Sequence, residues 1–113
     1  MKRIIALCLL LFVVLGSLST VFAWDANTEP NGYVSISSGW LRLRSGPSTG
    51  YTEIGYLTKG MAVRIHMNGL QENGFYYISA NCSNNKNHLD PIKDKSYFAY
   101  RYGYASSSYI RYY

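Results

Sequence analysis

Polar and apolar residues alternate in short runs along most of the chain. In residues 40–44, for example, Leu41 and Leu43 fall on one face and Arg42 and Arg44 on the other. This period of two predicts half-buried antiparallel β-strands. The same pattern recurs in four further segments, which are residues 33–37, 62–67, 75–80 and 97–102. We therefore expect an all-β domain.

Clusters of turn-forming residues separate these runs. Residues 45–50 combine Ser, Gly, Pro and Thr in an order that neither a strand nor a helix tolerates. Asn68-Gly69, followed by Glu72-Asn73-Gly74, predicts a hairpin with a loose loop, and Thr58-Lys59-Gly60 predicts a tight turn. The longest break, residues 81–95, contains four asparagines and a proline. Five or six short strands joined in this way favour a small barrel or sandwich.

The first residues have the pattern of a secretory signal peptide. Lys2 and Arg3 precede an apolar run over residues 4–16, and Val21-Phe22-Ala23 offers a small-residue cleavage site. The apolar run is shorter than the ~20 residues that span a bilayer. We expect cleavage after Ala23 and a processed chain that is secreted or periplasmic and does not span a membrane. Cys8 lies inside the run, so we do not expect it to carry a lipid.

Charge and cysteine content narrow the classes of function. Without Lys2 and Arg3, nine basic residues stand against six acidic ones, a net charge of about +3. The basic residues are scattered, which does not favour a nucleic-acid partner. Cys82 is the only cysteine after residue 23, so no disulfide can form within the processed chain. All 12 tyrosines lie in this part, and aromatic residues favour strands and binding faces.

Four blocks of residues resemble the bacterial SH3-like domain family. The first is Leu41-Arg42-Leu43-Arg44-Ser45-Gly46-Pro47-Ser48, which is similar to the family's apolar-x-apolar-Arg-Ser-Gly-Pro-Ser signature. The others follow in the family's order over residues 51–65, 73–76 and 103–110. The resemblance implies an SH3-like barrel of five to seven short antiparallel strands over residues 33–113, after a signal peptide (1–23) and a short lead (24–32).

The resemblance also assigns the positions that build the fold. We interpret them as architectural because turn and strand chemistry explains each of them; they are Leu41, Leu43, Arg44, Gly46, Pro47, Gly60, Gly103, Tyr104 and Tyr109. Arg44 has the donors to bind carbonyls of the loop that follows it. Phe75 and Tyr104 stand where the family has tryptophan. Residues 81–96 are an insertion where the family usually has a short hairpin, and long loops are often functional.

No residue pattern favours catalysis or metal binding. Cys82 is the candidate nucleophile, with His66 or His88 as a base, but no third group or peptidase signature accompanies them. Cys82, His88 and Asp90 are too few and too loosely spaced for structural zinc. Asn81-Cys82-Ser83 matches a glycosylation sequon, which the bacterial resemblance makes irrelevant. We expect no enzyme activity, no cofactor and no metal.

Tyrosines are the candidate ligand-binding residues, namely Tyr51, Tyr56, Tyr100 and Tyr102. Tyr100, Tyr102 and Tyr104 share one strand face, which is either the core or an aromatic platform. The family resemblance implies attachment to cell-wall peptidoglycan, through a groove between residues 45–54 and 81–96. The alternative is a protein–protein module that inhibits, or confers immunity to, a secreted enzyme.

Overall fold

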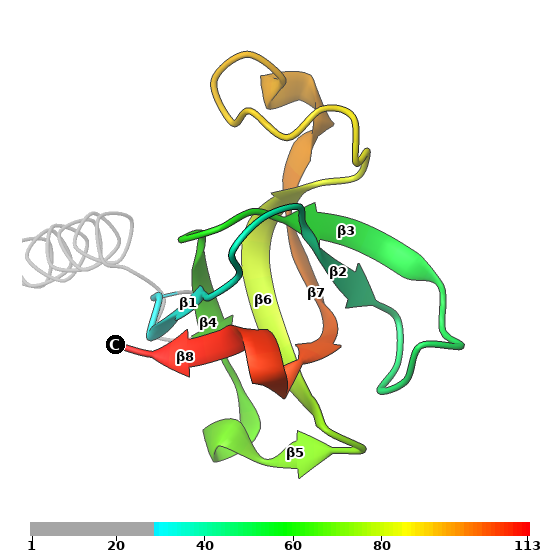
Figure 1. The fold of residues 1–113 in the computed structure, drawn as a ribbon, viewed down its shortest axis with the longest axis vertical. Coiled ribbons are helices and arrows are strands. Elements are labelled where there is room, and N and C mark those ends of the chain that lie inside the picture. Colours follow the sequence, from blue (N-terminus) through cyan, green and yellow to red (C-terminus); the bar gives the residue numbers. More distant parts are fainter. Residues whose placement is uncertain (1–28) are drawn as a thin grey trace, which may run out of the picture.

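The computed structural model describes residues 29–113, so the expected signal peptide lies outside the described residues. Within them the chain is all-β, with eight strands and three 3₁₀ turns (Figure 1). The elements are β1 (Gly32–Val34), β2 (Leu41–Arg44), β3 (Glu53–Leu57), β4 (Ala62–Ile65), η1 (Met67–Gly69), β5 (Gln71–Glu72), β6 (Phe75–Ser83), η2 (Lys95–Tyr97), β7 (Phe98–Ser106), η3 (Ser107–Tyr109) and β8 (Ile110–Tyr112).

The strands form a small barrel built around the β6–β7 hairpin. They follow the order β3-β2-β7-β6-β4-β1-β8, and β5 adds to β6. A further pairing of Tyr56 in β3 with Ser83 in β6 closes the β3-β2-β7-β6 part. β6 and β7 pair over nine positions, from Phe75↔Ser106 to Ser83↔Phe98. This long hairpin runs through the middle of the barrel (Figure 1).

The core follows from the alternation in the strands. In β6, Ile78, Ala80 and Cys82 are buried and face inward, while their neighbours face the other side of the strand. They pack with side chains from most other strands: Val34, Leu41, Leu43, Leu57, Val63, Ile65, Ala105 and Ile110. Burial of such side chains supplies the main stabilisation of a domain of this size.

Two sequence predictions differ from the structure in detail. The strand that was expected to end at Ala80 continues to Ser83, so Cys82 lies in a strand and not in a loop. Asn81 is polar because it is exposed, and Ser83 is polar because its buried hydroxyl bonds the backbone of Asn85; these two polar residues concealed the strand. The inserted segment proper is therefore residues 84–94, which project beyond the barrel (Figure 1). The described residues form eight strands rather than five to seven because β5 and β8 are too short to show a period.

Specific residues explain the turns. Asn73 and Gly74 both have positive φ, 54° and 79°, which is the backbone of a two-residue hairpin turn. At Gly103 a Cβ would lie 2.7 Å from the Arg44 carbonyl oxygen, so only glycine allows β7 to pair with β2 here. The side-chain amide of Asn31 bonds both the N–H and the carbonyl of Ile65, which ties the start of the described chain to β4.

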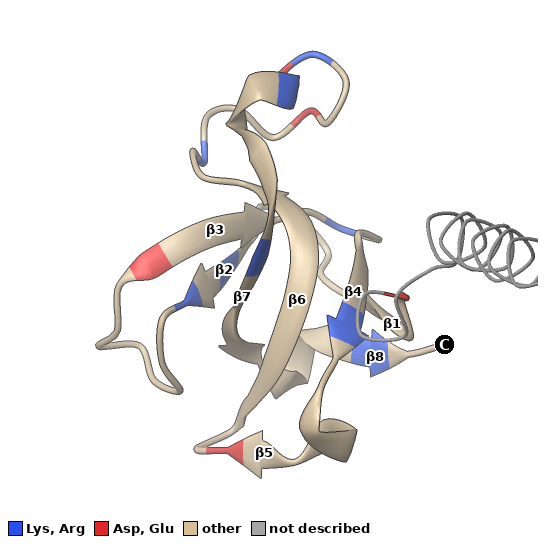
Figure 2. Ribbon diagram, turned by 180° about the vertical axis from the view of Figure 1, so that it is seen from behind, with Lys and Arg blue, Asp and Glu red and all other residues tan. Residues whose placement is uncertain are grey.

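Charges are spread over the described surface. Lys and Arg occur on β2, β4, β7, β8 and the 84–94 segment, and β6 carries none (Figure 2). No helix among residues 29–113 is long and apolar enough to cross a membrane.

Candidate functional site

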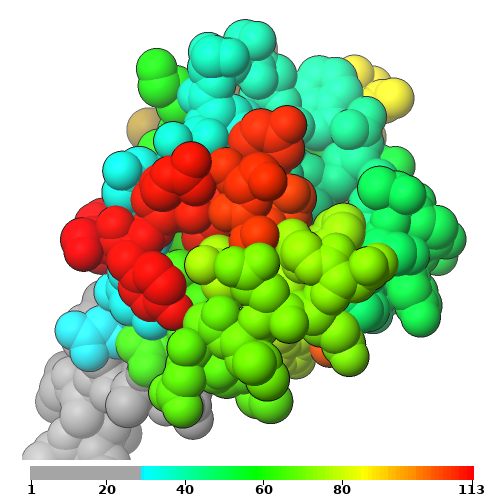
Figure 3. Space-filling view, turned by 60° about the horizontal axis from the view of Figure 1, so that its bottom comes forward, coloured from blue at the N-terminus to red at the C-terminus, as the bar shows by residue number. Residues whose placement is uncertain are grey.

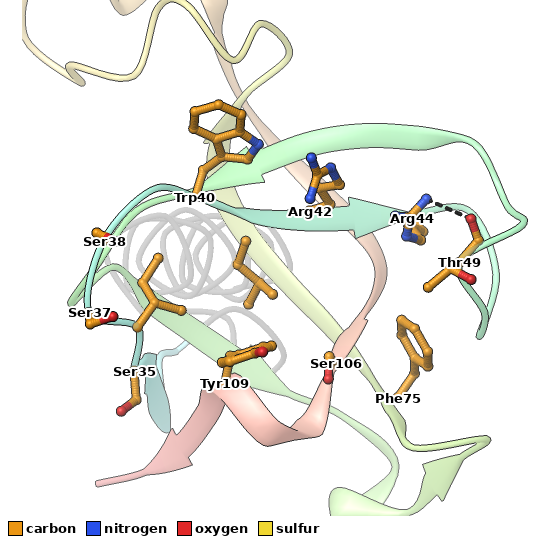
Figure 4. Close-up of a pocket in the computed structure, with 12 residues that line it drawn as sticks. Ser35, Ser37, Ser38, Trp40, Arg42, Arg44, Thr49, Phe75, Ser106 and Tyr109 are labelled. Atoms are coloured by element: carbon orange, nitrogen blue, oxygen red, sulfur yellow. Dashed lines mark hydrogen bonds between the residues drawn. The ribbon is translucent and has the colours of Figure 1, made fainter.

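The largest cavity that we describe is a groove of about 460 Å³ between β2 and η3. Trp40 and Arg42 lie on its β2 side, while Tyr109, Ser106 and Phe75 lie opposite (Figure 4). Its other lining residues are small or belong to β2 and the adjoining loops: Ser35, Ile36, Ser37, Ser38, Leu41, Arg44 and Thr49. The volume lies in the range of ligand pockets, and three aromatic rings give it an apolar lining.

Backbone and side-chain hydrogen bonds fix the walls of this groove. Ser35 N–H donates to the Tyr109 carbonyl at 2.8 Å, and Ser107 N–H donates to the Gly74 carbonyl at 2.9 Å. The Asn73 amide donates to the Pro47 carbonyl at 3.0 Å. The segments around η3 and the β5–β6 turn consequently pack side by side at this end of the molecule (Figure 3). A groove held in this way loses little conformational freedom on binding.

Arginines on β2 shape one end of the groove. Arg44 Nη1 donates to the carbonyls of Thr49 and Tyr51, both at 3.0 Å, and so holds the 45–52 loop (Figure 4). Arg42 Nε lies 3.2 Å from Glu53 Oε1, and its Cζ lies 6.0 Å from the centre of the Trp40 ring. Arg44 is thus occupied by its own loop, and Arg42 is the more exposed cation.

The four candidate tyrosines fall into separate places. Tyr51 is half exposed and packs on Gly46 in its own loop. Tyr56 lies on β3, and its hydroxyl donates to Glu53 at 3.0 Å. Partial burial, followed by this bond to Glu53, raises the pKa of Tyr56. Tyr100 and Tyr102 are neighbours on the outer face of β7, with ring centres 5.5 Å apart. None of the four lines the groove.

The groove therefore differs from the one expected between residues 45–54 and 81–96. Thr49 and Arg44 connect it to the first of these segments, but no residue of the second lines it. The inserted segment instead projects from the opposite end of the hairpin from Phe75 (Figure 1). The expectation failed because it placed the insertion beside the long loop, whereas the register of β6 and β7 carries it away.

The cysteine and the two histidines do not form a catalytic site. Cys82 is fully buried in the core, and burial raises the pKa of its thiol, so it stays protonated. His66 Nε2 lies 2.7 Å from Ser79 Oγ, and His88 stacks on Tyr97 with its Nδ1 3.1 Å from Asp94. Within residues 29–113, neither histidine hydrogen-bonds the thiol, and no three His, Cys, Asp or Glu side chains form a metal-binding group.

Ser79 and His66 form a hydrogen-bonded pair, and a serine beside a histidine suggests a nucleophile and its base. Its side chain is completely buried beneath its neighbours, however, and its Oγ also lies 2.6 Å from the Tyr100 hydroxyl. A nucleophile must be reachable by substrate. Ser79 is therefore a hydrogen-bonding link between two side chains on the outer face.

The chain matches the family model described as bacterial SH3 domain over residues 39–111. It belongs to the bacterial SH3 domain family. Members of this family are generally non-catalytic binding modules that are often associated with the cell wall. The small barrel described above is the fold that this membership requires. No curated protein and no solved structure matches the chain.

Sequence reasoning missed the groove although it named some of its residues. The sequence pattern places Trp40 in a strand, the resemblance makes Tyr109 architectural, and Phe75 stands where the family has tryptophan. A signal was nonetheless present, since both Phe75 and Tyr109 fall within motif blocks of the family and both are large aromatic residues next to turns.

Proposed function

We propose that this bacterial SH3 domain is an exported, non-catalytic module that binds cell-wall peptidoglycan, with the groove between β2 and η3 taking an extended peptide stem. The observation that carries the proposal is the set of three rings, Trp40, Phe75 and Tyr109, around a pre-formed cavity of about 460 Å³. Aromatic-lined grooves suit extended peptides because the rings pack against the chain and leave its polar backbone free to bond.

The polar lining supports a peptide as the ligand of the groove. Ser35, Ser37, Ser38 and Ser106 supply hydroxyl groups that both donate and accept hydrogen bonds. Arg42 offers a cation for a peptide carboxylate, although Glu53 partly neutralises it. The match to a family of binding modules that are often cell-wall associated supports the same class of partner.

Export is part of this proposal. The pattern over residues 1–23 favours a signal peptide, which would deliver the domain to the envelope. If so, the intact mass of protein recovered from the periplasm or medium corresponds to a chain that begins at Trp24. A recovered chain that retains Met1 would contradict export by this route.

The proposed ligand is tested by sedimentation with purified peptidoglycan sacculi. The protein is incubated with intact sacculi, alone or with an excess of a soluble competitor, which is either free stem peptide or the glycan strands that an amidase releases. We expect binding to intact sacculi, and we expect stem peptide to weaken this binding at least tenfold. Binding that stem peptide does not displace would overturn the assignment of the groove to peptide.

A second candidate is a protein–protein module that inhibits a secreted enzyme. The observation that favours it is Ile92, which is 89% exposed on the segment that projects from the barrel. Loops that project from a rigid scaffold often carry binding residues, and this one presents an apolar side chain. An inhibitor would ignore protein-free sacculi, so the same experiment separates the two candidates.

A further inference from the structure

The outer face of the β6–β7 hairpin carries a cluster of aromatic side chains that the groove does not use. In β6, Tyr77 and Ser79 alternate with the core residues and lie on the outer side of the strand. The register places Tyr104 opposite Tyr77 and Tyr102 opposite Ser79. Tyr100 follows on β7, and His66 follows β4. We name this cluster the tyrosine platform; its members are His66, Tyr77, Tyr100, Tyr102 and Tyr104.

The rings of the platform contact one another in a continuous series. The ring centres of Tyr77 and Tyr104 are 5.1 Å apart, and those of Tyr77 and Tyr102 are 6.3 Å apart. His66 stacks on Tyr102 at 5.5 Å with an interplanar angle of 27°. Tyr100 meets Tyr102 edge-on at 79°. The sequence had left open whether Tyr100, Tyr102 and Tyr104 face the core, and the structure places them on the outside.

A buried hydroxyl holds two of these side chains in place. Ser79 Oγ lies 2.7 Å from His66 Nε2 and 2.6 Å from the Tyr100 hydroxyl, and it has no exposed surface. The backbone N–H of His66 donates to the Tyr77 carbonyl at 2.9 Å, which holds the chain at His66 against β6. Side chains fixed in this way lose little rotational freedom when a ligand covers them, which favours binding.

The platform is exposed and uncharged. Tyr100 and Tyr102 are 40% and 45% exposed, so a ligand can reach both rings. Partial burial, followed by the charge of Arg64, lowers the pKa of His66, so the imidazole is neutral at pH 7. β6 carries no charged residue, and Arg64 lies at the margin, across β6 from Tyr102 (Figure 2). Such a face suits a neutral ligand and not a polyanion.

Pyranose sugars have the matching chemistry. Their C–H faces pack on aromatic rings, and their hydroxyl groups bond the phenolic oxygens at the ring edges. Tyr104, Tyr102 and Tyr100 follow one another on the same face of β7, with roughly 7 Å between successive Cα atoms. A linear polysaccharide can therefore lie along β7 and contact successive rings.

The platform continues the groove along the same hairpin. Phe75 and Ser106 pair at one end of the β6–β7 hairpin and line the groove. The next pair whose side chains lie on the outer face of the hairpin is Tyr77 and Tyr104. We propose that the tyrosine platform is a second binding site, which takes the neutral pyranose rings of a glycan strand while the groove takes the attached peptide. This inference deepens the proposed function, on which its cell-wall context rests, but it concerns other residues and another chemical class of ligand.

The test uses a soluble hexamer of N-acetylglucosamine, which contains no peptide. The hexamer is titrated into ¹⁵N-labelled protein, and the backbone amides are followed by NMR. We expect shifts at Tyr77, Tyr100, Tyr102 and Tyr104, with little change at Phe75 and Tyr109. Tyr102→Ala should weaken binding at least tenfold. The matched control is Tyr112→Ala, which removes a ring of similar exposure (49%) outside the platform and should bind like the wild type.

Several outcomes would overturn the inference. If Tyr102→Ala lowers the melting temperature strongly, Tyr100→Ala replaces it, because this side chain is also exposed. Unchanged affinity in the folded variant, or no shift at the platform amides with millimolar hexamer, excludes the site. Platform shifts on dilution of the protein alone would assign the face to a second copy of the chain. Binding to intact sacculi without binding to the hexamer would overturn the platform and leave the proposed function standing.

Discussion

The ring of Tyr51 lies directly against Gly46, where a Cβ would be 2.4 Å from Tyr51 Cδ1. Tyr51 was a candidate ligand-binding residue, and Gly46 was expected to permit a bend. The two residues pack against each other, since the tyrosine folds back over its own loop. Together with the two bonds from Arg44, this contact gives the 45–52 loop its shape.

A double-mutant cycle tests this contact. Gly46→Ala should destabilise the protein by about 1–3 kcal/mol because the added methyl group meets the ring. In a Tyr51→Ala background the space is free, and the same change should cost much less, since alanine also restricts the unfolded chain. Urea unfolding of the four proteins measures both steps. Equal costs in the two backgrounds would show that the ring does not explain the glycine.

The thiol of Cys82 is predicted to be inert in the folded protein. It is fully buried, and burial raises its pKa, so little thiolate forms near pH 8. Iodoacetamide should therefore modify it only after a denaturant is added, as mass spectrometry can show. Cys82→Ser should cost about 1–3 kcal/mol because a hydroxyl replaces an apolar contact in the core. Rapid labelling of the native protein would contradict this placement.

The sequence predicted the barrel well because its signal is local. The alternation in Leu41-Arg42-Leu43-Arg44 and the Asn73-Gly74 turn each depend on a few adjacent residues. The sites were harder to predict because they combine residues that are far apart in the chain. Trp40 and Tyr109 meet across the groove only after β2 and η3 are placed, and Tyr77 joins Tyr104 only through the register of the hairpin.

The position of the inserted segment also depends on pairing between residues that are far apart in the chain. Asn81, Cys82 and Ser83 looked like loop residues because the polar neighbours hide the inward-facing cysteine. Only the pairing with β7 reveals that the strand continues. Consequently the sequence could not tell that the insertion projects away from the 45–52 loop.

Stability should depend on pH through His66. Its pKa is lowered below the usual 6.5, first by burial and then by Arg64, while it is normal in the unfolded chain. The unfolded state therefore takes up a proton on His66 more readily than the folded state does. The stability that the protein has with a neutral His66 is fully present above about pH 6.5 and is lost as the pH falls. The melting temperature should drop between pH 7.5 and pH 5.5.

A variant of His66 tests this assignment. His66→Gln should reduce the difference in melting temperature between the two pH values. An unchanged difference in His66→Gln would mean that another group is responsible.

The central claim is that the groove binds cell-wall material, and sedimentation with intact sacculi at low and high salt tests it most directly. The comparison is between wild type, Tyr109→Ala and Tyr112→Ala, because these two tyrosines are equally exposed but only Tyr109 lines the groove. We expect wild type and Tyr112→Ala to sediment at both salt concentrations, since a scattered net charge of about +3 contributes only a screened attraction. Tyr109→Ala should bind at least tenfold more weakly. Wild type that stays in the supernatant under every condition, or Tyr109→Ala that binds like wild type, would contradict the claim.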